Sequence, residues 1–140
     1  MLEAWLAISW VGVLAASVAS FLLGGVWFAL LWAQPYARAL GREGGPLPPP
    51  TRLFLLGPMG CGLVMSITSA LLQGLLHTST PGAAATLGAV VGLGYLGATA
   101  TNVAINPNMP RPLLYALVNV PYFVLSSVSM HLIVFSLQRM

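Results

Sequence analysis

Four long apolar runs constrain the fold of this chain more than any other feature of its sequence. They cover residues 5–31, 53–76, 83–105 and 113–137. Each run is long enough to cross the hydrocarbon core of a bilayer as a helix, which takes about 20 residues. The runs are continuous rather than alternating, which favours helices over the strands of a membrane barrel. The sequence therefore predicts an all-α, integral membrane four-helix bundle with short connections, formed by a single domain over residues 1–140.

The composition agrees with a membrane protein and excludes several other classes. The chain is 58% hydrophobic and 5% charged, whereas charged residues make up about a quarter of a typical soluble domain. The net charge of +3 is too small and too dispersed to indicate nucleic-acid binding. The N-terminus lacks the basic segment of a signal peptide, so we expect it to be retained. A single cysteine, Cys61, excludes an intrachain disulfide.

The connections between the runs indicate how the bundle is oriented. The first connection contains GREGGPLPPP, which predicts an extended, exposed loop, with a proline-rich ligand for a partner domain as the alternative to a plain spacer. The first and third connections share one side of the membrane and carry four of the five arginines: Arg38, Arg42, Arg52 and Arg111. The positive-inside rule places that side in the cytoplasm. Both termini, with Glu3 and Arg139, would then face outward, and we expect a bacterial inner membrane.

Each predicted helix carries small or polar residues at steps of three and four, which place them on one face. These stripes can converge on a common interior, where they either pack together or line a cavity. Serine and glycine suit both arrangements, so both remain open. The glycines at 24, 88 and 92 are the expected packing positions. The stripes are Ala16, Ser20, Gly24 and Trp27; Gly62, Ser66, Ser69 and Gln73; Gly88, Gly92, Tyr95, Thr99, Asn102 and Asn106; and Tyr115, Asn119, Tyr122, Ser126 and Ser129.

Two prolines are expected to bend the bundle near its cytoplasmic side. Pro58 and Pro121 lie within the second and fourth runs. Proline lacks the N–H that a helix needs, so each leaves one carbonyl without its donor. In membrane helices such a carbonyl is usually satisfied by a neighbouring side chain, although it can also contribute to a site.

The residues available for catalysis are few. The chain has no Asp, and neither Glu lies within a run, which excludes a carboxylate pair, a carboxylate proton relay and a Ser-His-Asp triad. The remaining candidate metal ligands are His77 and His131 on the outer side and Cys61 in the inner half of the second run. Two histidines alone lack the further ligands of a protein zinc site. We therefore expect no enzyme, no metal and no haem or other cofactor.

His131 is the one ionisable group inside a run that invites a functional reading. Ionisable residues within membrane helices usually face the bundle interior. Its expected partners are Ser127, one turn earlier, or Ser9 or Ser17 from the first run. A neutral histidine that is hydrogen-bonded within the bundle is the simplest interpretation.

The stretch TNVAINPNMPRP interrupts the apolar pattern after the third run. Asn106 precedes Pro107, which disfavours helical geometry at the asparagine, so the helix should end there and a short turn should follow. Arg111 is expected at the headgroup level, where it would anchor a lipid phosphate together with Arg52 and Arg38. Asn102 is expected to face inward near Asn119. The predicted polar interior site comprises Asn102, Asn119, Thr99, Trp27 and Tyr122.

Several of these motifs together are similar to those of a known family. The segment GGVWFALLWAQPYARALG, the Thr101–Asn102 pair and the later Arg111–Pro112 pair resemble the domain of unknown function 1761 family. The resemblance implies a small, mostly bacterial membrane protein with four spans and no established activity. It matches a Gly-x-Trp-aromatic motif at Gly25, Trp27 and Phe28, and a polar residue early in the fourth helix at Asn119.

The chain departs from that family pattern in three places. Ala29 occupies a position where the family often has serine, and the first connection is rich in proline. No acidic residue lies between the Thr-Asn pair and Arg111, although the family often has one there. This last difference argues against a working charge pair in that loop.

Three functions can be compared on this basis. The first is an accessory or scaffold subunit that packs against other membrane helices or lipids, either in a complex with other subunits or as a homo-oligomer. The second is a passive channel or transporter for a small neutral solute, through a polar-striped bundle or oligomer; without a buried carboxylate, coupling to ions would be difficult. The third, a lipid enzyme, would need Arg111, Asn102 and His131 to cooperate, but the predicted topology separates the histidine from the other two across the membrane.

Overall fold

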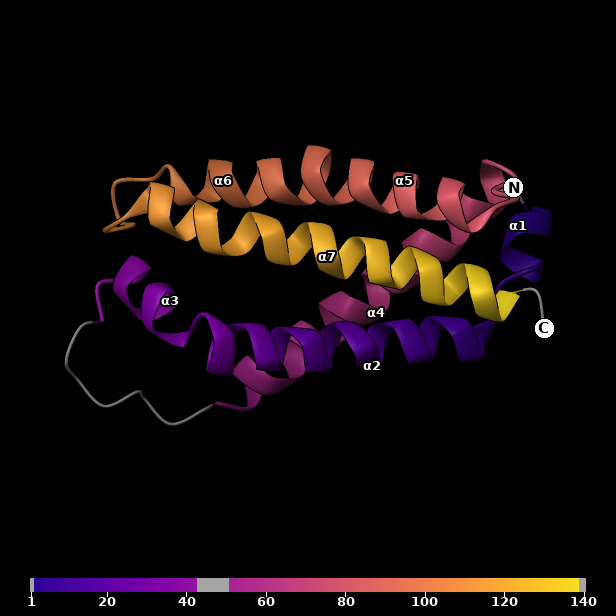
Figure 1. The fold of residues 1–140 in the computed structure, drawn as a ribbon. Helices are drawn as coiled ribbons and strands as arrows, with labels where there is room; N and C mark the ends of the chain where they lie inside the picture. The colour runs from indigo at the N-terminus through magenta and orange to yellow at the C-terminus, as the bar shows by residue number, and fades with distance from the viewer. Residues whose placement is uncertain (1, 43–50, 139–140) are drawn as a thin grey trace.

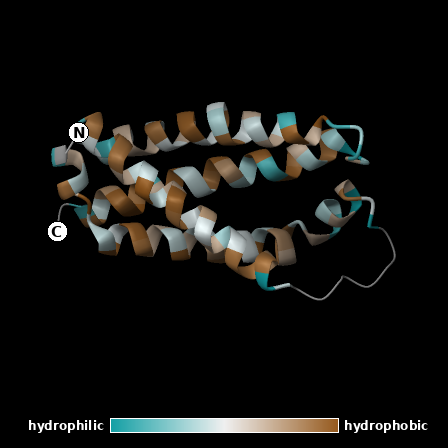
Figure 2. Ribbon diagram, turned by 180° about the vertical axis from the view of Figure 1, so that it is seen from behind, coloured by the Kyte–Doolittle hydropathy of each residue, from teal (hydrophilic) through white to brown (hydrophobic). Residues whose placement is uncertain are grey.

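The computed structural model describes residues 2–42 and 51–138, and these residues form helices and no strands. Four helical stretches are long and apolar enough to cross a membrane: Trp10–Leu31, Arg52–Leu75, Pro81–Ala104 and Pro112–Gln138. The first, third and fourth stretches lie along one common direction, and the second crosses obliquely behind the first, so that together they form an elongated bundle (Figure 1). Hydrophobic residues run along every long helix, and hydrophilic residues gather at the connection before the last one (Figure 2). The predicted fold class, an all-α bundle of four membrane-length helices, is confirmed.

The first predicted run is divided into two helices. α1 (Leu2–Leu6) is separate, and α2 (Trp10–Val26) begins where the Ser9 hydroxyl accepts a hydrogen bond from the Gly12 N–H at 3.2 Å. This bond caps the new helix and satisfies one of its free N–H groups. The expected single span from residue 5 is therefore corrected, because the Ser9 cap starts the membrane-length helix at Trp10. α1 instead packs on the end of the second span, where a Cβ on Gly74 would lie 3.3 Å from the Ala4 Cβ.

The chain remains helical after α2, at the end of the first run that the sequence predicts to be cytoplasmic. A π-helical turn, η1 (Trp27–Leu31), closes with a hydrogen bond of 2.8 Å from the Trp32 N–H to the Trp27 carbonyl. A short helix, α3 (Ala33–Ala39), follows. Two residues after it comes Gly41, whose φ of 69° suits a residue without a Cβ. The expected extended loop GREGGPLPPP lies almost entirely outside the described residues, as does Arg139.

The second span, α4 (Arg52–Leu75), starts with a cap from the Thr51 hydroxyl to the Phe54 N–H at 3.1 Å. It crosses behind α2 in Figure 1 and approaches the last helix only toward its own C-terminal end. Its buried residues all lie from the middle of the helix onward: Gly62, Ser66, Ser69, Ala70 and Gln73. The helix continues through Pro58, so the proline does not interrupt it.

The third span contains a π-helical turn in its middle. It consists of α5 (Pro81–Val91), η2 (Gly92–Gly97) and α6 (Ala98–Ala104), with the Thr80 hydroxyl capping the Ala83 N–H at 3.1 Å. A π-helical turn holds more residues than an α-helical turn, so it shifts the residues that follow relative to a 3.6-residue period. The buried positions reflect this shift, because they run Ala84, Gly88, Gly92, Gly97 and Ala104.

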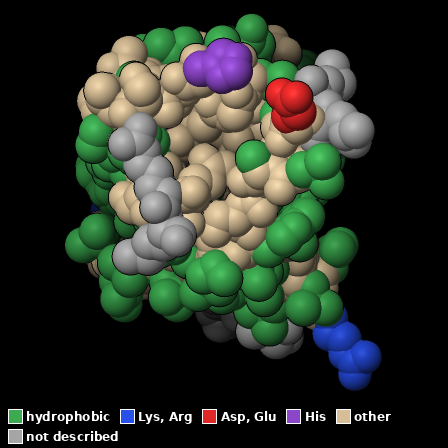
Figure 3. All heavy atoms as spheres, turned by 90° about the vertical axis from the view of Figure 1, so that its right-hand side faces the viewer, with side chains coloured by type: hydrophobic (Ala, Val, Ile, Leu, Met, Phe, Trp, Pro, Cys, Tyr) green, Lys and Arg blue, Asp and Glu red, His purple; other side chains and the backbone are tan. Residues whose placement is uncertain are grey.

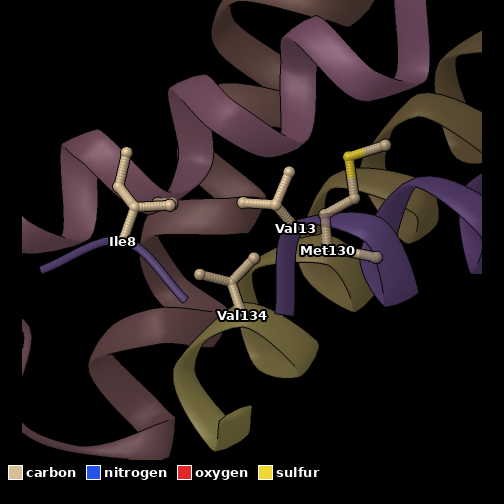
Figure 4. Close-up of a cluster of buried hydrophobic side chains, with 6 residues drawn as sticks. Ile8, Val13, Met130 and Val134 are labelled. Atoms are coloured by element: carbon tan, nitrogen blue, oxygen red, sulfur yellow. The ribbon is translucent and has the colours of Figure 1, made fainter. Parts of the chain in front are cut away.

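The fourth span, α7 (Pro112–Gln138), lies at the centre of the bundle and contacts each of the other three spans. It continues through Pro121 without interruption. An apolar cluster fills the half of the bundle near the chain termini (Figure 4). Ile8 precedes α2, and the other members lie on α2, α4 and α7: Val13, Ala16, Ala70, Met130 and Val134.

The two ends of the bundle differ in charge. The end formed by α3 and the start of α4 and α7 carries the exposed side chains of Arg38, Arg42, Arg52 and Arg111. The opposite end carries the exposed side chains of Glu3 and His77, and Figure 3 looks onto it. This arrangement places the first and third connections together, as a chain with four antiparallel spans requires.

Candidate functional site

The arginine-bearing end of the bundle contains a cluster of aromatic rings. Phe28 and Tyr122 meet edge to face with their centroids 4.8 Å apart, and Trp27 stacks on Trp32 at 5.8 Å. Tyr36 joins the cluster through Phe28 at 4.7 Å and connects it to Tyr115 at 6.1 Å. Edge-to-face and offset contacts of this kind stabilise ring pairs beyond their burial alone. The aromatic cluster therefore fixes η1 and α3 against the first half of α7.

Hydrogen bonds complete the attachment of the first span to α7. The Trp27 indole N–H donates to the Val118 carbonyl at 3.0 Å, and the indole is almost fully buried. The Tyr122 hydroxyl donates to the Ser20 carbonyl at 3.4 Å. One turn away, the hydroxyls of Ser20 and Ser126 share a buried hydrogen bond of 2.7 Å. These contacts join α2 and α7 through polar groups that would otherwise be unsatisfied in lipid.

The predicted polar interior site is only partly assembled. Trp27 and Asn119 are buried and Tyr122 is half-buried, as expected of inward-facing residues. Thr99 and Asn102 instead have exposed side chains, so their predicted inward orientation is corrected. Asn119 uses its amide within its own helix, donating to the Tyr115 carbonyl at 2.8 Å.

The π-helical turn η2 explains why the third stripe was mispredicted. A constant period of 3.6 residues carries the inner face from Gly92 to Tyr95, Thr99 and Asn102. In the structure the inner face passes from Gly92 to Gly97, and Tyr95 is 72% exposed. No feature of the sequence that depends on a fixed helical period could have revealed this turn.

The stripes on the other three spans, and the glycines with which the third stripe begins, are buried or half-buried, as the spacing indicates. The whole stripe of α4 is buried: Gly62, Ser66, Ser69 and Gln73. The Ser66 hydroxyl donates a hydrogen bond to the Gly62 carbonyl at 2.9 Å. The glycines of α5 and η2 lie directly on α7, because a Cβ on Gly92 would stand 2.8 Å from the Val124 Cα. Gly24 lies beneath the Tyr122 ring, whose hydroxyl oxygen is 3.0 Å from the position of a Cβ there.

Two open grooves lie on the outer surface of the described chain. One has a volume of about 500 Å³ and follows the first half of α4, between Leu56, Gly57, Gly60, Cys61, Val64 and Met65. The other has a volume of about 280 Å³ and lies between the third and fourth spans, where Tyr95, Thr99, Tyr115 and Phe123 contribute to its walls. Both grooves are open to the outside, and most of the surface that lines them is apolar.

The side chains that could bind a metal are spread over the molecule. Across residues 2–42 and 51–138, no three histidine, cysteine or acidic side chains come together as a metal site would require. His77 is exposed at one end, Cys61 is exposed on α4, and His131 is fully buried in α7. The buried His131 ring bonds through Nδ1 to the carbonyl of Ser127 at 2.8 Å. Ser127 was among its expected partners, but the acceptor is the backbone rather than the hydroxyl.

Tyr36 is a member of the aromatic cluster that sequence reasoning missed. It lies in α3, outside the spans, in a connection that the apolar pattern did not mark as structured. Burial raises the pKa of the Tyr36 phenol, the neighbouring Tyr115 raises it further, and Arg42 opposes both. The phenol therefore stays neutral in the physiological range and contributes to the cluster through its ring contacts.

The chain matches a known family model over most of its length. A family model described as "Protein of unknown function (DUF1761)" matches residues 11–135, which takes in all four spans. No curated protein and no solved structure matches the chain. The match confirms the family resemblance read from the Gly-x-Trp-aromatic and Thr-Asn motifs.

Proposed function

Since the chain belongs to the DUF1761 family of proteins of unknown function, we propose that it is a non-catalytic membrane subunit that docks on a transmembrane helix of another chain. The observation that carries this proposal is the position of the first half of α4. Leu53, Phe54 and Leu56 have between 62% and 80% of their surface exposed, and residues 51–61 include no buried side chain. The bundle thus leaves about three turns of a membrane-length helix outside its own packing.

The glycines of this segment support a helix rather than lipid as its neighbour. A Cβ on Gly60 would meet nothing within 4 Å, and one on Gly57 would meet only the Leu53 side chain of its own helix. Together with Cys61, Leu56 and Val64, both glycines line the groove of about 500 Å³. Small residues let two helix backbones approach closely in a membrane, where close packing drives association. A lipid chain gains no comparable benefit from glycine.

The interior of the bundle favours packing over conduction by a single chain. The Ser20 and Ser126 hydroxyls bond to each other, and the glycines at 88 and 92 place the α5–η2 backbone directly on α7. A passive channel for a neutral solute would need a polar passage along the bundle axis. The two grooves described above open outward and have mainly apolar linings, so the accessory function has the better support.

The lone cysteine provides a direct test of the docking segment. Cys61 is exposed in the α4 groove, so a thiol-reactive photocrosslinker attached to Cys61 should capture, in native membranes, a chain that occupies the groove. A product of twice the subunit mass would identify a second copy, and a product of another mass would identify a different subunit. We expect Gly60→Leu to abolish the product by filling the groove.

The matched control is Gly94→Leu, which adds the same side chain at another surface glycine with nothing within 4 Å. Crosslinking through Cys61 should survive this change. A Cys61 product that persists unchanged in Gly60→Leu would contradict the proposal, as would the absence of any product in membranes where the protein is natively expressed.

The arginines support a proposal for how the protein sits in its membrane. Arg38, Arg52 and Arg111 are all exposed at one end of the bundle, where anionic headgroups attract basic side chains. We place this end in the cytoplasm of a bacterial cell, with the inner membrane around the bundle and both termini outside. Lipid phosphates at that end would then help to hold the protein at a fixed depth.

A further inference from the structure

Two buried hydrogen-bond acceptors lie at the junction of α4 and α7, and the described residues offer neither of them a donor. They are Nε2 of His131 and Oε1 of Gln73. The His131 side chain is fully buried, and Gln73 is 3% exposed. Buried polar atoms in proteins nearly always have a hydrogen-bond partner, which is a protein group or an ordered water.

The bonds of the histidine ring define what its free nitrogen can do. Nδ1 lies 2.8 Å from the Ser127 carbonyl oxygen. A carbonyl only accepts, so Nδ1 must carry the hydrogen, and Nε2 of the neutral ring then presents a lone pair. The atom that lacks a partner is therefore an acceptor.

The Gln73 side chain is oriented by a hydrogen bond to the backbone of His131. Its Nε2 donates to the His131 carbonyl oxygen at 2.9 Å. The opposite amide orientation would bring two carbonyl oxygens together, so the hydrogen-bond network fixes this one. Gln73 Oε1 is consequently a second acceptor beside the same residue of α7.

A third helix closes the junction. A Cβ on Gly88 of α5 would stand only 2.9 Å from the Ser127 carbonyl oxygen, the same oxygen that holds the His131 ring. The ring is therefore held where α5 lies directly on α7, and Gln73 approaches from α4. Neither acceptor can reach bulk solvent by a simple rotamer change without breaking the bond that orients it.

The chemistry of the neighbourhood identifies the missing donor. A cation would need a compensating charge, but the sequence contains no Asp and its two Glu are Glu3 and Glu43, both outside the spans. An unpaired charge in such a site is far more costly than a neutral group. The donor must also be small, because both acceptors are enclosed. Water meets all of these requirements and commonly bridges such acceptors inside proteins.

We propose that the junction of α4, α5 and α7 is an internal water-binding site, in which bound water donates hydrogen bonds to His131 Nε2 and Gln73 Oε1. The site connects two helices through solvent that belongs to the fold. It stands apart from the α4 groove and does not depend on the docking function.

The test uses the fact that the chain has only two histidines. His77→Asn, at an exposed turn position, leaves His131 as the one histidine that isotopic labelling reports. Solid-state NMR on the ¹⁵N-histidine-labelled variant in lipid bilayers should show a ring protonated at Nδ1. Magnetisation should pass from water protons to Nε2, with a nitrogen shift typical of an accepted hydrogen bond. Protonation at Nε2, or no transfer from water, would overturn the proposal.

A second variant examines the shared site. In His77→Asn combined with Gln73→Leu, the water loses one of its two acceptors, so the transfer to Nε2 should fall sharply or disappear. Transfer of unchanged intensity in a folded variant would overturn the assignment of Gln73 Oε1 to the site. The single His77→Asn variant leaves the junction intact, so it decides the His131 contact even if the double variant does not fold.

Discussion

The Val128 Cα of α7 lies 2.7 Å from the position that a Cβ on Gly88 of α5 would occupy. Real Cβ atoms do not approach backbone atoms so closely, so the two helices can meet here only because residue 88 has no side chain. Gly92 repeats the contact one turn later, against Val124. In a bilayer, where apolar burial gives little advantage over lipid, such backbone contact is a main source of helix association.

Gly88→Leu should therefore destabilise the bundle by about 3 kcal/mol or more, because the added side chain must push α5 away from α7. Gly94→Leu is the matched control, since nothing lies within 4 Å of a Cβ at residue 94, and it should change stability by no more than about 0.5 kcal/mol. Reversible unfolding in mixed micelles, followed by circular dichroism, would measure both. Equal losses in the two variants would contradict the assigned contact.

Trp27→Phe should cost about 1–3 kcal/mol, because it leaves the buried Val118 carbonyl without the indole donor. Trp32→Phe is the control, since it preserves a ring stacked on Trp27 without touching that hydrogen bond. The same unfolding experiment compares them. If Trp32→Phe proved the more damaging change, the hydrogen bond would not be the main contribution of Trp27.

Ser20→Ala and Ser126→Ala should each destabilise the bundle by about 1–2 kcal/mol, because each leaves a buried hydroxyl unpaired. The double variant removes both polar groups and should be less destabilised than the sum of the two single changes. A double-mutant cycle measures this coupling. Strict additivity would indicate that the 2.7 Å contact contributes no shared energy.

His77→Gly should stabilise the protein by about 1 kcal/mol, because His77 adopts a left-handed conformation with φ of 50°. His77 follows the last residues of α4. At this helix end the Thr78 N–H donates to the Gln73 carbonyl at 3.0 Å. α3 ends in the same way with Gly41 at this position. Thermal unfolding would detect the gain, and His77→Val should lower stability for the same reason.

The proposed orientation can be checked by cysteine labelling in intact cells on a Cys61→Ala background. Thr80→Cys lies at the Glu3 and His77 end, and Asn108→Cys lies at the arginine end; both side chains are exposed. A membrane-impermeant maleimide should label residue 80 from outside, whereas residue 108 should react only after the membrane is opened. The reverse pattern would place the arginines outside.

Much of the fold follows from local patterns. The four spans begin at capping residues or helix-starting prolines that are visible in the sequence, such as Thr51 before α4 and Pro112 at the start of α7. The third span ends at Ala104, and Asn106 then forms a turn by accepting from the Asn108 N–H at 2.7 Å, close to the predicted stop before Pro107. The inward stripe of α4 was also readable, because that helix keeps a regular period from Gly62 to Gln73.

The candidate site was less predictable, because its position depends on where two helices touch. Placing Asn102 and Thr99 inside required the third span to keep a constant period, and η2 breaks that period. The π-helical turn places Gly97 against the Val120 side chain, with a Cβ at residue 97 only 3.1 Å from Val120 Cγ1. A regular α-helix would bring bulkier residues of the same turn toward α7.

The sequence by itself determined that the chain forms four membrane-length helices and which family motifs they carry, since hydrophobic length and helix capping are local properties of the chain. Only the tertiary structure decided which side chains the helices enclose. Gly88, Gly92 and Gly97 pack closely on α7 in a span that contains a π-helical turn, and in this arrangement Asn102 is exposed while His131 and Gln73 are buried. The physical reason is that backbone contact between helices depends on the fit of two surfaces, which no single helix encodes.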